Sequence, residues 1–285
     1  MESPTPPAGE PLAPTVVSDF PATPAPTPLP AASPTPMPPA PEPTASPTST
    51  PTRTPTATAT KTPPPTQTPT LTPTPTRTPV PTPVVSATEV LRGNKQKPWV
   101  ALTFDADAAA DPAPLVLDTL KQYQVRATFF ILGWWATRHP DLVRRMVAEG
   151  HEIGNHSNTH PDFRTLTREQ MVEELSAAEA IIQEVAGRTS KPFFRPPYSY
   201  RNELVRQVAA EEGYLTVVWT IDAFDWRPAA TQESILQQIL ENVVPGAIIV
   251  QHVGDANSAA VLPRVIEELR ARGFELVTLS EVLAP

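Results

Sequence analysis

The sequence predicts an α/β fold, a distorted (β/α) barrel of about seven parallel strands preceded by a long disordered Pro/Thr-rich segment. Three observations support this prediction. From about residue 95, short apolar runs alternate with longer amphipathic ones. The folded part has about 190 residues, which suits a small barrel or an open doubly wound sheet. No Gly-x-Gly-x-x-Gly follows the first strand, so the dinucleotide-binding form of the open sheet has no support and the barrel is favoured.

The first 90 residues are expected to form a disordered stalk or linker. Of the 40 prolines, 28 fall in residues 1–83, together with many Thr, Ala and Ser residues. Such a segment has too few large apolar side chains to offset the entropy lost on ordering. Its Thr-Pro repeats favour polyproline II structure and are typical of a stiff tether or an O-glycosylated stalk, although a tail that only provides spacing has the same composition. Residues 91–285 are expected to form the folded catalytic domain.

Charge and residue usage narrow the partners and the compartment. The formal charge is −8, of which residues 1–90 contribute −2, so no nucleic-acid partner is expected. Because cysteine is absent, a disulfide framework and a thiolate metal site are excluded. The N-terminus has neither the basic start nor the apolar run of a signal peptide, and no transmembrane segment is predicted. Since such stalks are typical of exported proteins, we expect an extracellular or cell-wall location and a sequence that begins downstream of an export signal.

Seven apolar runs in the folded part have the length and composition of buried strands. Amphipathic stretches with apolar residues three and four apart separate them and predict crossover helices, so the sheet should be parallel. The predicted strands are 99–105, 127–132, 151–156, 192–195, 215–222, 247–252 and 275–279. The predicted helices are 114–123, 141–150, 167–187, 202–212, 231–243 and 259–272.

Two of the predicted helices carry recognisable end signals. Thr167 precedes Gln170 by three residues, which is a capping-box pattern, and Gly187 ends the same helix. The helix 141–150 follows Pro140 and closes at its glycine. These signals support helical crossovers rather than long loops.

Polar side chains follow five of the seven predicted strands. In parallel α/β folds the carboxyl ends of the strands meet at one edge, where active sites form. Each residue alone has an ordinary explanation, such as a turn-forming aspartate, a surface arginine, a core histidine or a packed tryptophan. At the same end of successive strands, however, they together predict a functional site. The set is Asp105 and Asp107, His156 and His160, Arg195, Asp222, Asp225 and Trp226, and His252.

The chemistry of this set points to metal-assisted hydrolysis. His156 and His160 are four residues apart, and two imidazoles with one carboxylate leave coordination positions open on Zn²⁺, Co²⁺ or Ni²⁺, as in catalytic rather than structural sites. Such an ion activates water and polarises a carbonyl. A second carboxylate would accept the proton of the water, and a separate histidine such as His252 would protonate the leaving group.

Five short motifs carry a family resemblance. "TFDAD", "HSNTH", "RPPY", "DAFDW" and "IIVQH" occur in this order. With them the sequence resembles the polysaccharide deacetylase, or NodB homology, family of carbohydrate esterases over residues 98–283. The resemblance implies a distorted barrel with fewer than eight repeats and the removal of acetyl groups from N-acetylated sugars with a divalent metal.

The resemblance also implies a role for each matched residue. Asp105 would be the general base, with its carboxylate held by Arg195. His252 would be the general acid, oriented by Asp225. The other implied roles are metal binding by His156 and His160, an acetyl-methyl pocket at Trp226 and Val250, and oxyanion stabilisation by the backbone N–H of Tyr198.

One position departs from the family pattern. The family has two adjacent aspartates in the first motif, the second of which completes the metal site, but Ala106 stands there and Asp107 replaces the usual glycine. A methyl group cannot bind a cation, so either Asp107 reaches the metal from one residue further along, or two histidines and water hold it more weakly. Asp111 is a more distant third candidate. We expect Asp107 to be the third ligand.

The expected function is deacetylation of a polysaccharide that contains N-acetylglucosamine, such as peptidoglycan or a chitin-like polymer, outside the cell. An O-acetyl xylan esterase or a cyclic-amide hydrolase of the same fold is an alternative, because ester and amide substrates present the same carbonyl. Ala106 favours a third possibility, a catalytically impaired module that binds the cell wall. The retained base, acid, arginine and histidines argue against it.

Overall fold

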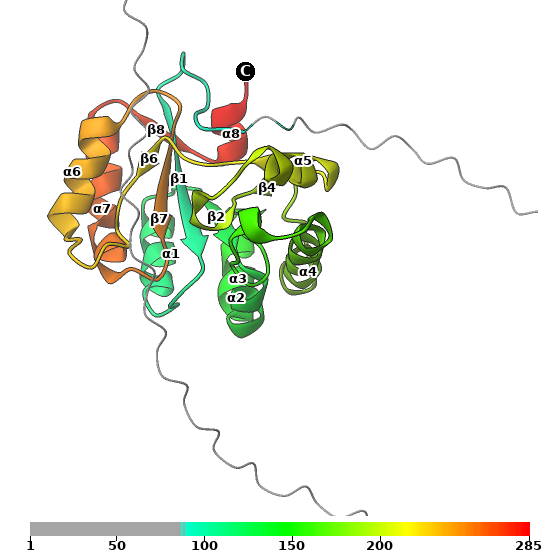
Figure 1. The fold of residues 1–285 in the computed structure, drawn as a ribbon. Helices are drawn as coiled ribbons and strands as arrows, with labels where there is room; N and C mark the ends of the chain where they lie inside the picture. The colour runs from blue at the N-terminus through cyan, green and yellow to red at the C-terminus, as the bar shows by residue number, and fades with distance from the viewer. Residues whose placement is uncertain (1–86, 88) are drawn as a thin grey trace, which may run out of the picture. The chain divides into compact units, whose positions relative to one another are not determined.

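The computed structural model describes residue 87 and residues 89–285 (Figure 1). Its strands pair in parallel in the order β5-β4-β3-β2-β1-β7-β6, and β8 also pairs with β1. The outer strands β5 and β6 follow each other in the chain, so the sheet curls into an open, distorted α/β barrel, which confirms the predicted fold class. The strands are β1 (Trp99–Ala106), β2 (Thr128–Ile131), β3 (Glu152–Asn155), β4 (Phe193–Phe194), β5 (Leu215–Thr216), β6 (Ile221–Asp222), β7 (Ala247–His252) and β8 (Glu275–Val277).

Helices cover the outer side of this sheet. In Figure 1, α6 and α7 lie together on one side of the barrel, and α2, α3 and α4 lie together on the other. The sequence predicts six of these helices, whereas α2 and α8 are too short to show apolar periodicity. The helices are α1 (Ala113–Gln122), α2 (Gly133–Arg138), α3 (Pro140–Ala148), α4 (Arg168–Ala186), α5 (Glu203–Glu211), α6 (Gln232–Asn242), α7 (Ala256–Ala271) and α8 (Leu279–Leu283).

The predicted ends of α4 are confirmed. Thr167 and Gln170 form a reciprocal capping box, and Gly187 ends the helix with a φ of 68°, in the left-handed region that glycine tolerates best. Both ends of α4 are therefore defined by local capping interactions.

The predicted strand 215–222 is in fact two short strands. Between β5 and β6 the chain leaves the sheet. There Val217 pairs in parallel with Val90, which lies near the start of the described residues. The Val90 amide donates to the Thr216 carbonyl and the Val218 amide donates to the Val90 carbonyl, both at 2.8 Å. Apolar composition could not reveal the interruption, because the residues between the two strands are themselves mostly apolar and the partner lies more than a hundred positions away.

The two faces of β1 have different surroundings. Leu102, Phe104 and Ala106 are buried in the large apolar cluster between the sheet and its helices. Since side chains alternate along a strand, Thr103 and Asp105 point to the opposite face, into the barrel. The alternation of side chains along β1 therefore directs the carboxylate of Asp105 into the barrel.

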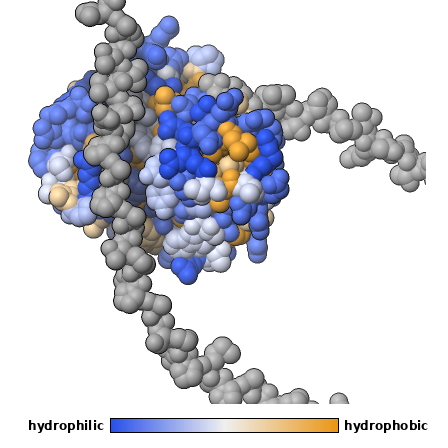
Figure 2. Space-filling model, in the orientation of Figure 1, coloured by the Kyte–Doolittle hydropathy of each residue, from blue (hydrophilic) through white to orange (hydrophobic). Residues whose placement is uncertain are grey.

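The face drawn in Figure 2 is mostly hydrophilic and carries only small hydrophobic areas. Large apolar side chains that are exposed in the described residues are Leu91, Leu115, Tyr198, Tyr200, Leu204 and Trp226. Among the described residues, no helix combines the length and the apolar character that crossing a bilayer requires.

Candidate metal and catalytic site

The strand ends bring the predicted polar residues to one edge of the sheet. The parallel pairing of β1 with β7 puts Asp105 opposite His252, and the pairing of β3 with β4 puts Asn155 opposite Phe194. His156 and Arg195 directly follow that second pair, so they leave the sheet at the same edge. The register of the strands therefore agrees with the prediction that these side chains gather at the carboxyl ends of the strands.

Three side chains at this edge form a group with the composition of a metal site. One potential ligand atom each from Asp107, His156 and His160 lies within 4.8 Å of the other two. The His160 Nε2 atom is 3.7 Å from Asp107 Oδ2. Among the described residues, no other group brings three or more potential ligands together in this way. Asp111 is not part of the group.

The donor set of this group fits a divalent cation. The Nδ1 atom of His156 lies 2.8 Å from the Arg195 carbonyl, so this nitrogen donates a hydrogen bond and Nε2 is the ring nitrogen left to bind a metal. Burial lowers the pKa of His160 to about 4, with His156 adding to the shift, so this imidazole is neutral at physiological pH, as a metal ligand must be. Two imidazoles and one carboxylate match the ligand set of an open, catalytic Zn²⁺ site.

Strand geometry explains how Asp107 can take the place of the missing aspartate. Ala106 is fully buried and packs into the apolar cluster on the helix side of β1. Asp107, one residue further on, returns to the side on which Asp105 lies. Burial raises the pKa of Asp107, whereas the nearby imidazoles of His252 and His156 oppose this shift. A cation in the group would favour the ionised carboxylate.

Asp105 forms a buried ion pair with Arg195. The Arg195 Nη1 atom donates to Asp105 Oδ1 at 2.6 Å, and Nη2 donates to the Thr103 hydroxyl at 2.8 Å. The Arg195 side chain is fully buried, with its guanidinium 4.0 Å from the ring centre of Phe130. Burial is the largest single effect and would raise the pKa of Asp105, but the charge and hydrogen bond of Arg195, together with the charges of His156 and His252, outweigh it, and the pKa is lowered. Asp105 is consequently ionised at neutral pH, and it is not one of the three potential ligands, although its Oδ2 atom lies 3.8 Å from His156 Nε2.

His252 is paired with Asp225 through both carboxylate oxygens. Asp225 Oδ1 lies 2.7 Å from the ring Nδ1 of His252, and Oδ2 accepts the His252 backbone N–H at 2.7 Å. Burial tends to lower the pKa of His252, but the hydrogen bond and charge of Asp225 dominate, and with Asp105 and Asp107 they raise the pKa to about 10. His252 therefore carries a proton at neutral pH.

The residues expected to bind substrate lie around this centre. Tyr198 is 57% exposed, and its ring packs edge-on against His160 with 4.3 Å between ring centres. Its φ of 56° is unusual for a non-glycine residue, and such backbone strain is concentrated at functional sites. Val250 is buried on β7, on the same face as His252 two residues later. Trp226 is 56% exposed, so it is not a core residue.

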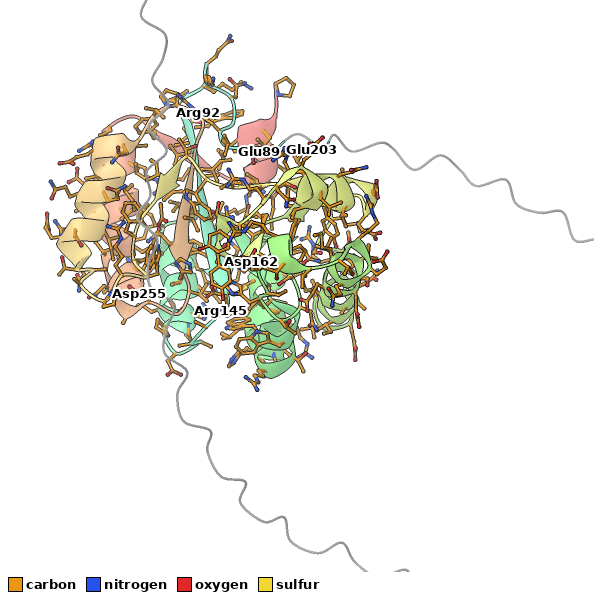
Figure 3. All side chains as sticks on the ribbon, viewed as in Figure 1. Glu89, Arg92, Arg145, Asp162, Glu203 and Asp255 are labelled. Carbon is orange, nitrogen blue, oxygen red and sulfur yellow. The ribbon has the colours of Figure 1, made fainter. Side chains whose placement is uncertain are left out.

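Two further contacts on the rim were not predicted from the sequence. Asp222 accepts the Trp226 Nε1–H on Oδ2 at 3.3 Å and the Phe224 backbone N–H on Oδ1 at 2.7 Å, so it anchors both this exposed ring and the turn. The Arg164 guanidinium lies 3.7 Å from the ring centre of Tyr200 and pairs with Asp162, which Figure 3 labels. Spacing could not reveal either contact, because both depend on the folded loops.

The chain is similar to proteins of a known family. The family model for polysaccharide deacetylase matches residues 92–217. A peptidoglycan-N-acetylglucosamine deacetylase of Bacillus cereus is 36% identical over 191 residues, which cover 66% of this chain and 69% of that protein.

Solved structures of similar proteins include active and inactive members. A family 4 carbohydrate esterase of Bacillus subtilis, PdaA, superposes with a TM-score of 0.66 at 30% identity, covering 69% of this chain and 85% of that one. A CE4 family pseudoenzyme from Bacillus anthracis superposes with a TM-score of 0.67 at 28% identity, covering 70% of both chains. A mutant of that pseudoenzyme is described as having restored enzymatic activity.

Proposed function

The chain belongs to the polysaccharide deacetylase family, and from this premise we propose that it is a metal-dependent hydrolase that removes acetyl groups from polysaccharide containing N-acetylglucosamine outside the cell. The observation that supports the proposal best is the arrangement at the carboxyl end of the sheet, where two charged pairs flank three potential metal ligands. One pair supplies a carboxylate ionised at neutral pH, and the other supplies a protonated imidazole. Hydrolysis of an amide is accelerated by a base that accepts the proton of the water and an acid that protonates the leaving nitrogen.

Asp107, His156 and His160 would hold the metal. When bound, a divalent ion supplies a Lewis acid that lowers the pKa of water toward neutrality and polarises the acetyl carbonyl. Zn²⁺ is the proposed ion, with Co²⁺ and Ni²⁺ as alternatives, because imidazole and carboxylate ligands suit all three.

Asp105 would act as the general base. Arg195 keeps its carboxylate ionised, so Asp105 can accept the proton of the water as the water oxygen attacks the acetyl carbon. The backbone N–H of Tyr198 would donate to the oxygen of the carbonyl as negative charge develops there.

His252 would act as the general acid. It would transfer a ring proton to the amide nitrogen as the bond from carbon to nitrogen breaks, which releases acetate and leaves an amine on the sugar. Asp225 orients the imidazole and stabilises its charged form. Trp226 and Val250 would enclose the acetyl methyl group.

Peptidoglycan is the substrate that the proposed location favours. Residues 1–90, most of which lie outside the described residues, would act as a stalk that lets the catalytic domain reach into the wall. Chitin-like oligomers present the same N-acetylglucosamine unit, so they serve as the simplest test substrate.

The proposal is tested with the full chain, stripped with chelator and then supplied with Zn²⁺ or Co²⁺. Acetate release from chitin oligomers, peptidoglycan fragments and acetylated xylan is measured for the wild type, His156→Ala and the control His139→Ala. We expect metal-dependent release from the N-acetylglucosamine substrates that only His156→Ala abolishes. An active His156→Ala protein would overturn the metal role, and release from xylan alone would favour the esterase alternative.

A binding module is the second candidate, because the similar structures include a pseudoenzyme and the usual second aspartate is Ala106. This candidate predicts that the folded chain binds peptidoglycan but releases no acetate from any of the three substrates with either metal. Binding of peptidoglycan by sedimentation, measured beside the acetate assay, separates the two candidates.

A further inference from the structure

The loop that joins the two histidines of the metal group is held by side chains at every backbone N–H. Asn155 Oδ1 accepts from the Ser157 amide at 2.8 Å, and the Ser157 hydroxyl accepts from the His160 amide at 3.1 Å. The two amides between them, those of Asn158 and Thr159, both donate to Glu174 Oε2, at 2.9 and 2.8 Å. The loop from Ser157 to His160 therefore takes its shape from side-chain acceptors rather than from a regular backbone ladder.

The conformation of this loop needs such support. Ser157 has a φ of 76° and His160 a φ of 66°, both in the left-handed region that residues other than glycine rarely adopt. A strained backbone of this kind persists only when surrounding contacts determine it. The left-handed turn at His160 helps to direct its imidazole back toward His156, with 5.1 Å between the two ring centres.

Glu174 makes more of these contacts than any other side chain. It comes from the middle of α4, and besides the two amides it accepts the Thr159 hydroxyl on Oε1 at 2.6 Å. No ion pair among the described residues includes Glu174. Its hydrogen bonds are thus all directed to the loop, and hydrogen bonds to a charged carboxylate are stronger than those between neutral groups.

The start of α2 holds the same loop from its carbonyl side. The Gly133 amide donates to the Ser157 carbonyl at 3.0 Å, and the Trp134 amide donates to the Asn158 carbonyl at 3.2 Å. A Cβ at Gly133 would lie 2.4 Å from Asn158 Oδ1 and 3.1 Å from the Ala178 Cα, so the approach is too close for a side chain. The loop is clamped between α2 and α4.

We propose that Glu174 is a positioning residue for the metal centre, which fixes the distance and orientation of His156 and His160 by bonding the backbone between them. Glu174 is not one of the three potential ligands, and its hydrogen bonds go to the loop between the two histidines. Residues that orient metal ligands from outside typically change metal affinity about 10–100-fold when they are replaced. The inference rests on the proposed metal site, and its test keeps the two apart.

The test measures Co²⁺ binding by isothermal titration calorimetry with the full chain stripped of metal. We expect Glu174→Ala to weaken the Kd at least about 10-fold. Glu174→Asp keeps the charge but is one methylene too short to reach the loop, so it should lose a similar factor. Glu174→Gln retains an oxygen for the two amides and should lose less. The control is Glu173→Ala, at the exposed neighbouring position on α4, which should bind as the wild type does.

A merely structural role is distinguished by activity at saturating Co²⁺. If Glu174 acts by holding the ligands, an excess of Co²⁺ should recover most of the acetate release of Glu174→Ala, whereas general loss of structure is not recovered by metal. Wild-type Kd values for both Glu174→Ala and Glu174→Asp would overturn the inference. If Glu174→Ala does not fold, the Glu174→Asp and Glu174→Gln titrations decide. Absence of Co²⁺ binding by the wild type would instead refute the proposed metal site.

Discussion

Asp105 and Asp107 project from the same side of the end of β1, and each lies beside a different histidine. Asp105 Oδ2 is 3.8 Å from His156 Nε2, and Asp107 Oδ2 is 3.7 Å from His160 Nε2. The residue between them, Ala106, points into the core on the helix side. The alternation of side chains thus separates a carboxylate held by Arg195 from one directed to the proposed metal.

Replacement of Asp107 tests whether it is the third ligand. Asp107→Ala removes the only carboxylate of the group, so the Kd for Zn²⁺ or Co²⁺ should weaken by more than the 10–100-fold typical of residues outside the ligand shell, about 100-fold or more. Calorimetric titration of the stripped protein measures it. The control is Asp111→Ala, at an exposed position outside the group, which should leave the Kd unchanged. Equal affinities for wild type and Asp107→Ala would mean that two histidines and water suffice.

Replacement of Arg195 tests the buried ion pair. Arg195→Met leaves the Asp105 carboxylate buried without its cation, and breaking a buried pair in this way costs about 3–5 kcal/mol of unfolding free energy. The same change removes the charge of Arg195, which does most to offset the effect of burial on the pKa of Asp105, so this pKa should rise. Urea denaturation measures the stability change. Arg144→Met, which breaks an exposed pair with Asp141, should cost no more than about 1 kcal/mol. Equal losses for the two variants would contradict the buried-pair account.

Several features of the fold could be predicted from the sequence because they depend on local patterns. The strand cores follow from apolar runs, and α4 follows from its capping box and terminal glycine. The gathering of Asp105, His156 and His252 follows from one rule, that parallel strands end at the same edge. These predictions needed no knowledge of which segments touch.

Other features depend on contacts between distant segments. The break between β5 and β6 depends on Val90, and nothing in an apolar run shows where a remote strand partner will interrupt it. Glu174 has the same sequence context as its exposed neighbour Glu173, and only the packing of α4 beside the histidine loop distinguishes them. The roles of such residues follow from tertiary structure alone.

The pair of His252 and Asp225 should make the stability of the metal-free chain depend on pH. The folded pKa of His252, about 10, lies above its ordinary value of 6.5, so its contribution is complete below pH 6.5 and is lost as pH rises toward 10. In Asp225→Asn the main cause of the shift is gone. The difference in unfolding free energy between wild type and variant should therefore shrink by up to roughly 5 kcal/mol from pH 6 to pH 10.

Urea denaturation at a series of pH values, with chelator present, measures this difference. The control is Asp118→Asn, which removes an exposed carboxylate paired with Arg145 and should give a difference nearly independent of pH in this range. A constant difference between wild type and Asp225→Asn from pH 6 to pH 10 would show that His252 titrates normally.

Trp226 should contribute to substrate binding without contributing much to stability. Its ring is more than half exposed and is held by the hydrogen bond to Asp222, so Trp226→Ala removes little buried area and should change unfolding free energy by no more than about 0.5 kcal/mol. If the ring encloses the acetyl group, the same variant should lose at least about 10-fold in kcat/KM for chitin oligomers.

Asp222→Asn keeps an oxygen that can accept the indole N–H and should lose less. Leu115→Ala, which truncates an exposed apolar side chain on α1, serves as the control and should retain full activity. A Trp226→Ala protein with wild-type kcat/KM would place the acetyl pocket elsewhere, because an exposed aromatic ring with no effect on turnover does not line it.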